Sequence, residues 1–266
     1  MKNSLFVVCL FGLFAFGSNA SSHPTTGGVA IDIVDNDGKA FPVYEINKKK
    51  ESRIYRAYLE AVYGENYKIR VRNQTNQRVG LVIAVDGRNI ISGNKSDLGS
   101  TERMYVLGPY EQARYDGWRT SQSQVHRFFF TDSENSYADA WGDHSAMGVI
   151  TVAVYREQIA TDPYRKQESK SRRESGKPKH PSSMSEMESA GDAVAQPGTG
   201  FGSEYYSPVR IVRFDPLPQP AEKFFYKYEW RETLCVKGIL NCRQPKNRFW
   251  PDDPERYGFA PYPPEY

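Results

Sequence analysis

Alternation of polar and apolar residues is clearest at residues 67–73, which read YKIRVRN. The tyrosine, isoleucine and valine of this run fall on one face, and the lysine and two arginines fall on the other. A period of two with one polar face is typical of a strand in an antiparallel sheet. Residues 79–85 (VGLVIAV) are apolar on both faces, which predicts a central, buried strand. The polar segment 73–77 between the two runs predicts a hairpin turn.

Shorter runs of β-branched and aromatic residues, separated by turn residues, predict further strands. We place them at 41–46, 53–62, 105–107, 112–115, 125–131 and 148–155. Within the run at 125–131, Phe128 and Phe130 should share one face and Phe129 the other. About eight short strands at close spacing predict an all-β fold, an antiparallel β-sandwich or a jelly-roll-like domain.

Turn and loop residues divide these runs. Asp86-Gly87 predicts a tight turn because glycine readily adopts positive φ, and Gly117-Trp118-Arg119 predicts a second turn. Residues 94–103 and 132–147 lack periodicity and predict loops. The predicted connections are therefore short apart from these two segments.

Composition changes sharply after residue 157. The following residues are dominated by Ser, Lys, Arg, Glu and Pro, which predicts a disordered linker. Alternation returns at 205–213 and 224–230, and we expect these runs to be strands that join the first block, the alternative being a small separate domain. The chain is thus divided into a signal peptide (1–20), a loose segment (21–40), a β domain (41–157), a disordered linker (158–197), completing strands (198–242) and a Pro- and aromatic-rich tail (243–266). Within the loose segment, only the short run at 29–34 (VAIDIV) alternates.

Residues 1–20 have the pattern of a secretory signal peptide. Lys2 precedes an apolar run at 5–17, and Ser18-Asn19-Ala20 is a small-x-small cleavage site. The apolar run is too short to span a bilayer as a helix. An uncleaved anchor is the alternative. We therefore expect an exported protein, located in the periplasm or extracellular space, with no transmembrane segment after cleavage.

Charge and cysteine content narrow the possibilities. Without residues 1–20 the chain would be near-neutral, which argues against a general nucleic-acid-binding protein. The same cleavage removes Cys9 and leaves Cys235 and Cys242, an even count that predicts a disulfide bond in an oxidising compartment. A metal site at these cysteines is the weaker alternative, because no histidine or third cysteine lies nearby.

Few motifs suggest catalysis or a cofactor. Residues 198–202 (GTGFG) lead into a predicted strand rather than a helix, so a close backbone approach is favoured over phosphate binding. Asp143, His144 and Ser145 are adjacent, and neighbouring side chains on an extended chain point apart instead of forming a relay. His126 and His144 with nearby aspartates remain candidates for a metal-dependent or hydrolytic site, although no ligand spacing supports one.

The candidate binding surface is a set of turn and loop residues. Loop aspartates at 86, 97, 132 and 143 are expected to cap their own turns, with a calcium or ligand site as the alternative. Large aromatic residues near loops either stack on a sugar or protein partner or cover the ends of the core. The ligand-binding candidates are Asp86, Asn89, Trp118, Arg119, Tyr137 and Trp141.

Several segments resemble a family of exported bacterial proteins of unknown function. The resemblance rests on VDGRN at 85–89, GWR at 117–119, SYA at 136–138 and GTGFG at 198–202. It covers residues 67–157 and 198–214, somewhat under half of the chain. It implies one β domain interrupted by a linker, and it implies no activity, because none is known for the family.

The sequence therefore predicts an exported, non-enzymatic β-sandwich that binds an unknown protein or carbohydrate partner or associates with the envelope. No cofactor is expected. One alternative is an enzyme that uses His126 or His144. A second is adhesion to an anionic surface polymer through residues 165–180, which contain seven basic residues and only two glutamates.

Overall fold

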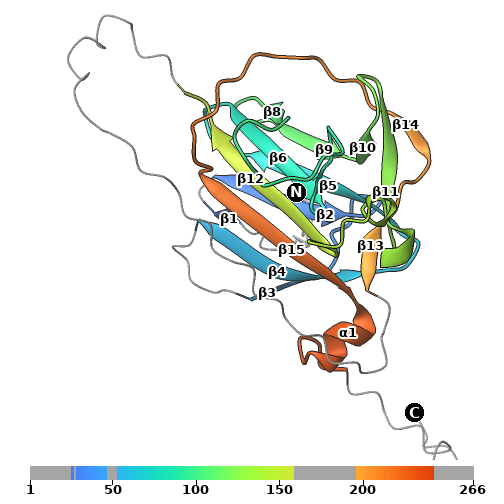
Figure 1. Cartoon of the computed structure of the whole chain (residues 1–266). Coiled ribbons are helices and arrows are strands. Elements are labelled where there is room, and N and C mark those ends of the chain that lie inside the picture. The colour runs from blue at the N-terminus through green and yellow to red at the C-terminus, as the bar shows by residue number, and fades with distance from the viewer. Residues whose placement is uncertain (1–24, 27, 47–52, 159–195, 243–266) are drawn as a thin grey trace, which may run out of the picture.

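The computed structural model describes residues 25–26, 28–46, 53–158 and 196–242. The predicted signal peptide, the basic segment 165–180, almost all of the predicted linker and the tail lie outside the described residues. Two β-sheets pack face to face in the described part (Figure 1). This confirms the predicted all-β sandwich.

The first sheet is built around β5 and β11. Its strands are β1 (Thr25–Thr26), β2 (Val29–Val34), β5 (Asn66–Asn73), β9 (Gln112–Tyr115), β10 (Gly117–Arg119), β11 (Gln124–Asp132), β13 (Pro197–Thr199) and β14 (Glu204–Tyr206). β5 pairs with β2, β9 and β11, and β11 also pairs with β10, β13 and β14. All of these pairs are antiparallel.

The second sheet is mixed. Its strands are β3 (Val43–Glu45), β4 (Ile54–Ala61), β6 (Val79–Val85), β7 (Arg88–Asn89), β8 (Tyr105–Leu107), β12 (Val149–Arg156) and β15 (Glu222–Trp230). β15 lies between β12, to which it is antiparallel, and β4, to which it is parallel. Residues 222–230 therefore complete this sheet rather than forming a separate unit. The other regular elements are the 3₁₀ helices η1 (Ser133–Asn135) and η2 (Asp139–Trp141) and the helix α1 (Arg231–Val236).

The core follows the predicted alternation. Along β5 buried and partly exposed residues alternate, and every residue of β6 is buried. Phe128 and Phe130 are fully buried whereas Phe129 on the opposite face is partly exposed. The rings of Tyr67 and Phe130 stack with their centroids 4.4 Å apart. Large aromatic side chains from both sheets thus fill the space between them.

The connection between β5 and β6 differs from the prediction. β5 belongs to the first sheet and β6 to the second, so residues 73–77 cross between sheets and the predicted hairpin is wrong. Asn73 holds the crossing in place, because its side-chain Nδ2 donates to the carbonyl oxygens of Gln77 and Gly108, each at 2.7 Å. The alternation along each strand was correct, but it carries no information about the partner strand.

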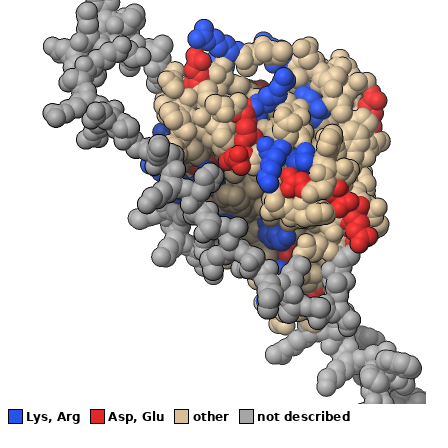
Figure 2. Space-filling model, viewed as in Figure 1, with Lys and Arg blue, Asp and Glu red and all other residues tan. Residues whose placement is uncertain are grey.

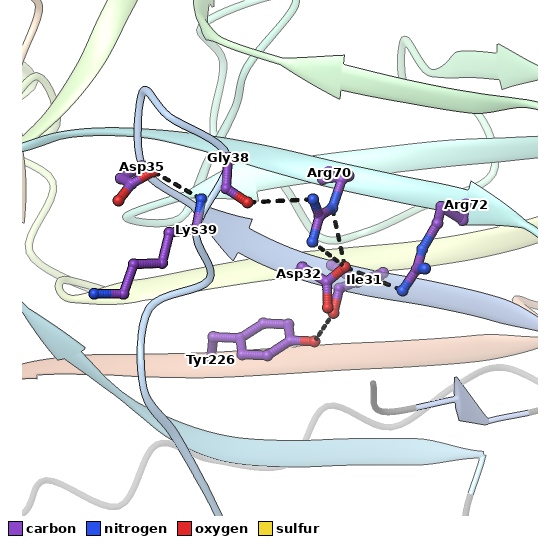
Figure 3. Close-up of polar contacts among 8 residues, drawn as sticks. All are labelled: Ile31, Asp32, Asp35, Gly38, Lys39, Arg70, Arg72 and Tyr226. Carbon is purple, nitrogen blue, oxygen red and sulfur yellow. Dashed lines mark hydrogen bonds and ion pairs between the residues drawn. The ribbon is translucent and has the colours of Figure 1, made fainter. Parts of the chain in front are cut away.

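Within the segment 21–40, the alternating run at 29–34 (VAIDIV) forms the strand β2. β2 is buried at every position and pairs with β5. Its one acidic residue, Asp32, is 6% exposed and receives hydrogen bonds from Arg70 Nε at 3.1 Å and Arg72 Nη2 at 3.2 Å (Figure 3). The Tyr226 hydroxyl donates to the Ile31 carbonyl at 3.0 Å and ties β2 to the opposite sheet. Pairing with Arg70 and Arg72 on the polar face of β5 offsets the desolvation cost of burying Asp32 in this strand.

Two further predictions need correction. Gly117–Arg119 is not a turn but β10, where glycine is required because a Cβ at 117 would lie 1.9 Å from the His126 carbonyl oxygen. The strand expected over 205–213 is limited to β14, and no residue from 207 to 214 is in a strand. The side chains of this second segment are largely exposed, up to 84% at Ile211.

The end of the described chain is closed covalently. Cys235 in α1 and Cys242 form the predicted disulfide bond, with their Cα atoms 5.4 Å apart. Among the described residues, no helix has the length and apolar character needed to cross a membrane.

Candidate functional site

Asp86 lies at the centre of a buried polar cluster. It occupies the turn between β6 and β7, with a φ of 49° that aspartate tolerates better than most residues. Its carboxylate accepts hydrogen bonds from the backbone N–H groups of Gly148 at 2.8 Å and Thr199 at 2.7 Å, and from the Tyr228 hydroxyl at 2.5 Å. Asp86 is fully buried. The predicted turn is confirmed, but the carboxylate joins distant segments instead of capping its own turn.

A chain of hydroxyl groups extends this cluster across the core. The Thr199 hydroxyl lies 2.8 Å from the Tyr228 hydroxyl and 2.8 Å from the Tyr67 hydroxyl. Burial raises the pKa of the Asp86 carboxyl to about 6, against the opposing effect of its hydrogen bonds. Burial also raises the pKa of Tyr67 and Tyr228 well above the usual range, so both stay neutral. We call Asp86, Gly148, Thr199, Tyr67 and Tyr228 the Asp86 cluster.

The Asp86 cluster has the contacts of a structural element. Every oxygen of the carboxylate has a donor within the protein, and no part of it reaches solvent. It fastens the β6–β7 turn, the start of β12, the 198–202 segment and β15 to one another. Among the other loop aspartates, Asp143 does cap its own turn, accepting from the Ser145 N–H at 3.2 Å and its hydroxyl at 2.6 Å.

Two more predicted ligand-binding residues are buried. Asn89 is 1% exposed, and its side chain donates to Glu102 and to the Arg103 carbonyl while accepting from the Ile91 N–H at 2.9 Å. Trp118 is 2% exposed, and its indole N–H donates to the Gly200 carbonyl at 3.0 Å. For Trp118, covering the end of the core is therefore the correct interpretation. Neither side chain offers a free surface to a ligand.

The aromatic residues near the loops form a row of ring contacts. Phe201 packs against His126, with ring centroids 4.0 Å apart, and against Tyr137, at 5.5 Å, and both pairs are nearly parallel. These contacts hold the 198–202 segment against β11 and the loop at 133–147. Trp141 differs, because it is 62% exposed although the Arg88 guanidinium lies over its ring at 5.3 Å.

The histidine candidates do not form a shared site. His126 Nδ1 lies 2.8 Å from the Gly202 carbonyl oxygen, whereas His144 is exposed and lies 3.4 Å from Asp139. The Ser145 hydroxyl donates to Asp143 rather than to a histidine, so residues 143–145 lack the relay of a triad. In the part of the chain that the structure describes, no three histidine, cysteine or acidic side chains gather as they would around a metal ion.

A groove lies elsewhere in the described part of the chain, beneath residues 207–214, which we call the arch. In Figure 1 the arch passes over β8 on its way from β14 to β15. Its first end is held by the Val209 N–H, which donates to the Gln122 carbonyl at 2.8 Å, and by Arg119, which donates to the Ser207 carbonyl at 2.9 Å. Its other end is held by Arg78, which donates to the Arg213 carbonyl at 2.7 Å.

Between these anchors, the arch and the body of the protein enclose a groove of about 1240 Å³. The groove is lined by Arg78, Ile91, Arg103, Met104, Tyr105, Val106, Gly108, Pro109, Glu111, Arg119, Thr120, Ser121, Gln122, Val209, Arg210, Ile211, Val212 and Arg213. Aliphatic side chains and five arginines thus meet in one depression, with a single acidic residue. Figure 2, in the same view as Figure 1, shows basic (blue) and acidic (red) side chains interspersed on this face of the molecule. The groove is therefore both apolar and positively charged.

The five arginines have different surroundings. Arg119 is fully engaged, since its Nε donates to the Tyr105 hydroxyl at 2.7 Å and its other nitrogens bond Ser121 and Ser207. Arg78 pairs with Glu157 at 2.9 Å, and Arg213 pairs with Asp215 at 3.4 Å. By contrast, the side chains of Arg103 and Arg210 are exposed, and neither has a hydrogen bond or ion pair with any described residue. These two cations remain available to a ligand.

Of the six predicted ligand-binding residues, only Arg119 lines the groove. The rest of the groove was missed because its parts come from segments far apart in the chain, β8 and its flanks, the residues after β10, and the arch. The sequence did contain one indication of the groove. The alternating run at 205–213 predicted a strand, and a strand-forming segment without a pairing strand among the described residues is a candidate site for binding a further strand.

Comparison with models of known protein families, with curated proteins and with solved structures gives no match to this chain. The resemblance to a family of exported bacterial proteins therefore stays an expectation.

Proposed function

We propose that this chain is an exported, non-enzymatic binding protein or envelope-associated interaction module that holds its ligand in the groove beneath the arch. The observation that carries the proposal is the groove itself, with a volume of about 1240 Å³ and a lining of mixed apolar and cationic residues. Ligand sites are typically concave and largely apolar, with a few polar groups that fix orientation. Arg103 and Arg210, whose side chains have no partner among the described residues, supply those polar groups.

The lining chemistry favours binding over catalysis. It contains neither histidine nor cysteine nor aspartate, and its one acidic residue, Glu111, accepts the Gly108 N–H at 2.6 Å. The hydroxyls of Thr120 and Ser121 bond to Gln124 and Ser123 rather than to a histidine or carboxylate that could act as a general base. An acid–base or nucleophilic mechanism would need such a pair within hydrogen-bond reach.

Export is supported by the pattern of residues 1–20 and by the Cys235–Cys242 disulfide, which is typical of oxidising compartments. Mass spectrometry of protein recovered from periplasm and medium tests this part. We expect a mature chain that begins at Ser21 and contains no free thiol. Recovery of the full-length chain from the cytoplasm with two free thiols at 235 and 242 would contradict export.

A photo-crosslinking residue placed in the groove tests the ligand site. Thr120 lines the groove and is exposed, whereas Thr101 is equally exposed and lies outside it. We replace each in turn with p-benzoylphenylalanine and irradiate intact cells that export the protein. An adduct is expected at position 120 and not at position 101. Equal labelling at both positions, or none at position 120, contradicts the proposal.

The same assay addresses the enzymatic alternative. His126→Ala and His144→Ala are both expected to retain the adduct at position 120, because neither histidine lines the groove. Loss of the adduct in His144→Ala, whose side chain is exposed and makes a single ion pair, would favour the histidine-based site.

A further inference from the structure

The arch has the sequence of a strand, but no strand of the described residues pairs with it. Val209, Ile211 and Val212 are β-branched, which favours extended pairing, yet they are 37%, 84% and 41% exposed. Within the described residues, the peptide groups of 210, 211 and 212 make no backbone hydrogen bond, although both ends of the arch are anchored. A run of this kind is normally paired in a sheet. Its pairing groups and its aliphatic side chains are both left unused.

The opposite wall of the groove also offers an unpaired strand edge. β8 pairs with β6 along one edge, and it has no other strand partner among the described residues. Tyr105 and Val106 of β8 line the groove, so its second edge borders the same space as the arch. Proteins usually cover or blunt such an edge. Here two unpaired edges border one depression.

The lining of the groove is also positively charged. Arg103 comes from the β8 wall and Arg210 from the arch, and neither has a partner among the described residues. Glu111, the one acidic residue of the lining, is already bonded to the backbone. A ligand that carries carboxylates on its two sides would pair with both arginines. Such pairs are strengthened when the guanidinium binds the carboxylate bidentately.

We propose that the groove receives an extended polypeptide segment with acidic side chains, which adds as a strand to the arch or to β8. This inference rests on the proposed function and names the class of its ligand. Strand addition of this kind takes affinity from main-chain hydrogen bonds and specificity from side-chain contacts. The aliphatic lining accepts the apolar side chains of the segment, and Arg103 and Arg210 accept its carboxylates.

The groove is less suited to the other anionic ligands. Its single aromatic ring, Tyr105, lies under the Arg119 guanidinium at 5.5 Å and packs against Tyr115 at 4.3 Å, so no ring face is free for a sugar. An acyl chain needs an enclosed apolar tunnel, and the aliphatic side chains of the arch are open to solvent. Neither ligand would satisfy the free peptide groups at 210–212.

Fluorescence anisotropy with labelled synthetic peptides of about ten residues, the upper range of strand length, tests the proposal. Three peptides separate charge from pairing: alternating Glu-Val, alternating Lys-Val, and alternating Glu-Pro, in which proline removes every second N–H donor. We expect the Glu-Val peptide to bind and the other two to bind at least about tenfold more weakly. Affinity for the Glu-Val peptide should fall as salt concentration rises.

Charge reversal in the protein provides the matched variants. Arg103→Glu and Arg210→Glu are each expected to weaken the Glu-Val peptide by about tenfold. Arg53→Glu changes the same charge at an exposed site outside the groove and should leave affinity unchanged. The Arg103→Glu/Arg210→Glu double variant should gain affinity for the Lys-Val peptide, a rescue that misfolding could not produce.

The outcomes separate this inference from the proposed function. Equal binding of the Glu-Pro and Glu-Val peptides would overturn strand addition, and equal binding of the Lys-Val peptide would overturn the charge preference. Binding of palmitate with no binding of any peptide overturns the inference, while an adduct at position 120 still supports the groove as the ligand site. Absence of that adduct overturns the proposed function as well.

Discussion

The Asp86 cluster and the groove both contain polar groups, but those of the cluster are buried and paired and those of the groove are exposed. In the Asp86 cluster a carboxylate, two hydroxyl-bearing tyrosines and a threonine are buried, and each has a partner within the protein. In the groove two arginines and three peptide groups lie at the surface without partners among the described residues. A fully satisfied buried network stabilises one structure, because any missing member leaves costly unpaired groups. An unsatisfied concave surface is free to bind.

Residue types that are common in binding sites did not mark the exposed site in this protein. Asp86 and Trp118 draw attention in the sequence as candidate ligand contacts, and both are buried. Arg103 and Arg210 are inconspicuous in the sequence and line the groove. Accessibility and remaining hydrogen-bond capacity, rather than residue type, distinguish the two regions.

The largest expected effect comes from removing the centre of the Asp86 cluster. Asp86→Ala leaves the N–H groups of Gly148 and Thr199 and the hydroxyl of Tyr228 without their acceptor in a buried site. We expect a loss of about 4 kcal/mol in the free energy of unfolding, measured by denaturant titration. The control is Asp35→Ala, which removes the cap of an exposed turn, where its carboxylate accepts from the N–H groups of Asp37 and Lys39, and should cost about 1 kcal/mol. Similar losses for both variants would contradict the structural role assigned to Asp86.

The second effect is a pH dependence with a definite sign. Because the pKa of Asp86 is about 6 in the folded protein and near 3.8 when unfolded, the folded state binds an extra proton between these pH values. Stability from this group is therefore present below pH 3.8 and is lost as pH rises to about 6, by about 3 kcal/mol in total.

Asp86→Asn isolates this contribution, since asparagine does not titrate. Burial also raises the pKa of Asp116, so the quantity to measure is the difference between wild type and variant across the window. We expect the stability of wild type relative to Asp86→Asn to decrease as pH rises, and then to level off above pH 6. Parallel curves for the two proteins would rule out titration of Asp86 in this range.

The third effect concerns the segment that carries Thr199 into the Asp86 cluster. A Cβ at Gly200 would lie 2.2 Å from the Phe129 ring, so Gly200→Ala forces that ring or the segment to move. We expect a loss of about 2 kcal/mol in the free energy of unfolding, from overpacking. At Gly99 the nearest atom to an added Cβ is 3.8 Å away, so Gly99→Ala should change stability by less than about 0.5 kcal/mol.

The features of this structure that depend on neighbouring residues could be predicted from the sequence. Alternation identified the buried faces of β5, β11 and β15, and Asp86-Gly87 identified its turn, because both signals lie within a few neighbouring residues. Pairing across the chain left no such signal. Nothing near Glu222–Trp230 indicates that β15 runs between β12 and β4, parallel to β4.

The same limit explains the candidate site. Asp86 and Thr199 are 113 residues apart in the chain, so their contact could not be read from a local pattern. The alternation at 205–213 indicated the extended character of the arch. It could not indicate that no strand of the described residues pairs with residues 207–214, which is the property that makes the groove a candidate binding site.

The smallest expected effect on stability is at the groove. Side chains kept for binding should contribute little to the free energy of unfolding, in contrast to those of the Asp86 cluster. Arg210→Glu and Ile211→Asn replace exposed side chains of the arch, so each should change the free energy of unfolding by less than about 0.5 kcal/mol. Binding of the Glu-Val peptide should nevertheless weaken in both, through lost charge pairing in the first and lost apolar contact in the second. A stability loss above about 1 kcal/mol in either variant, measured by denaturant titration, would show that the arch already packs against a partner within the chain. The groove would then be part of the folded core rather than a place for a second molecule.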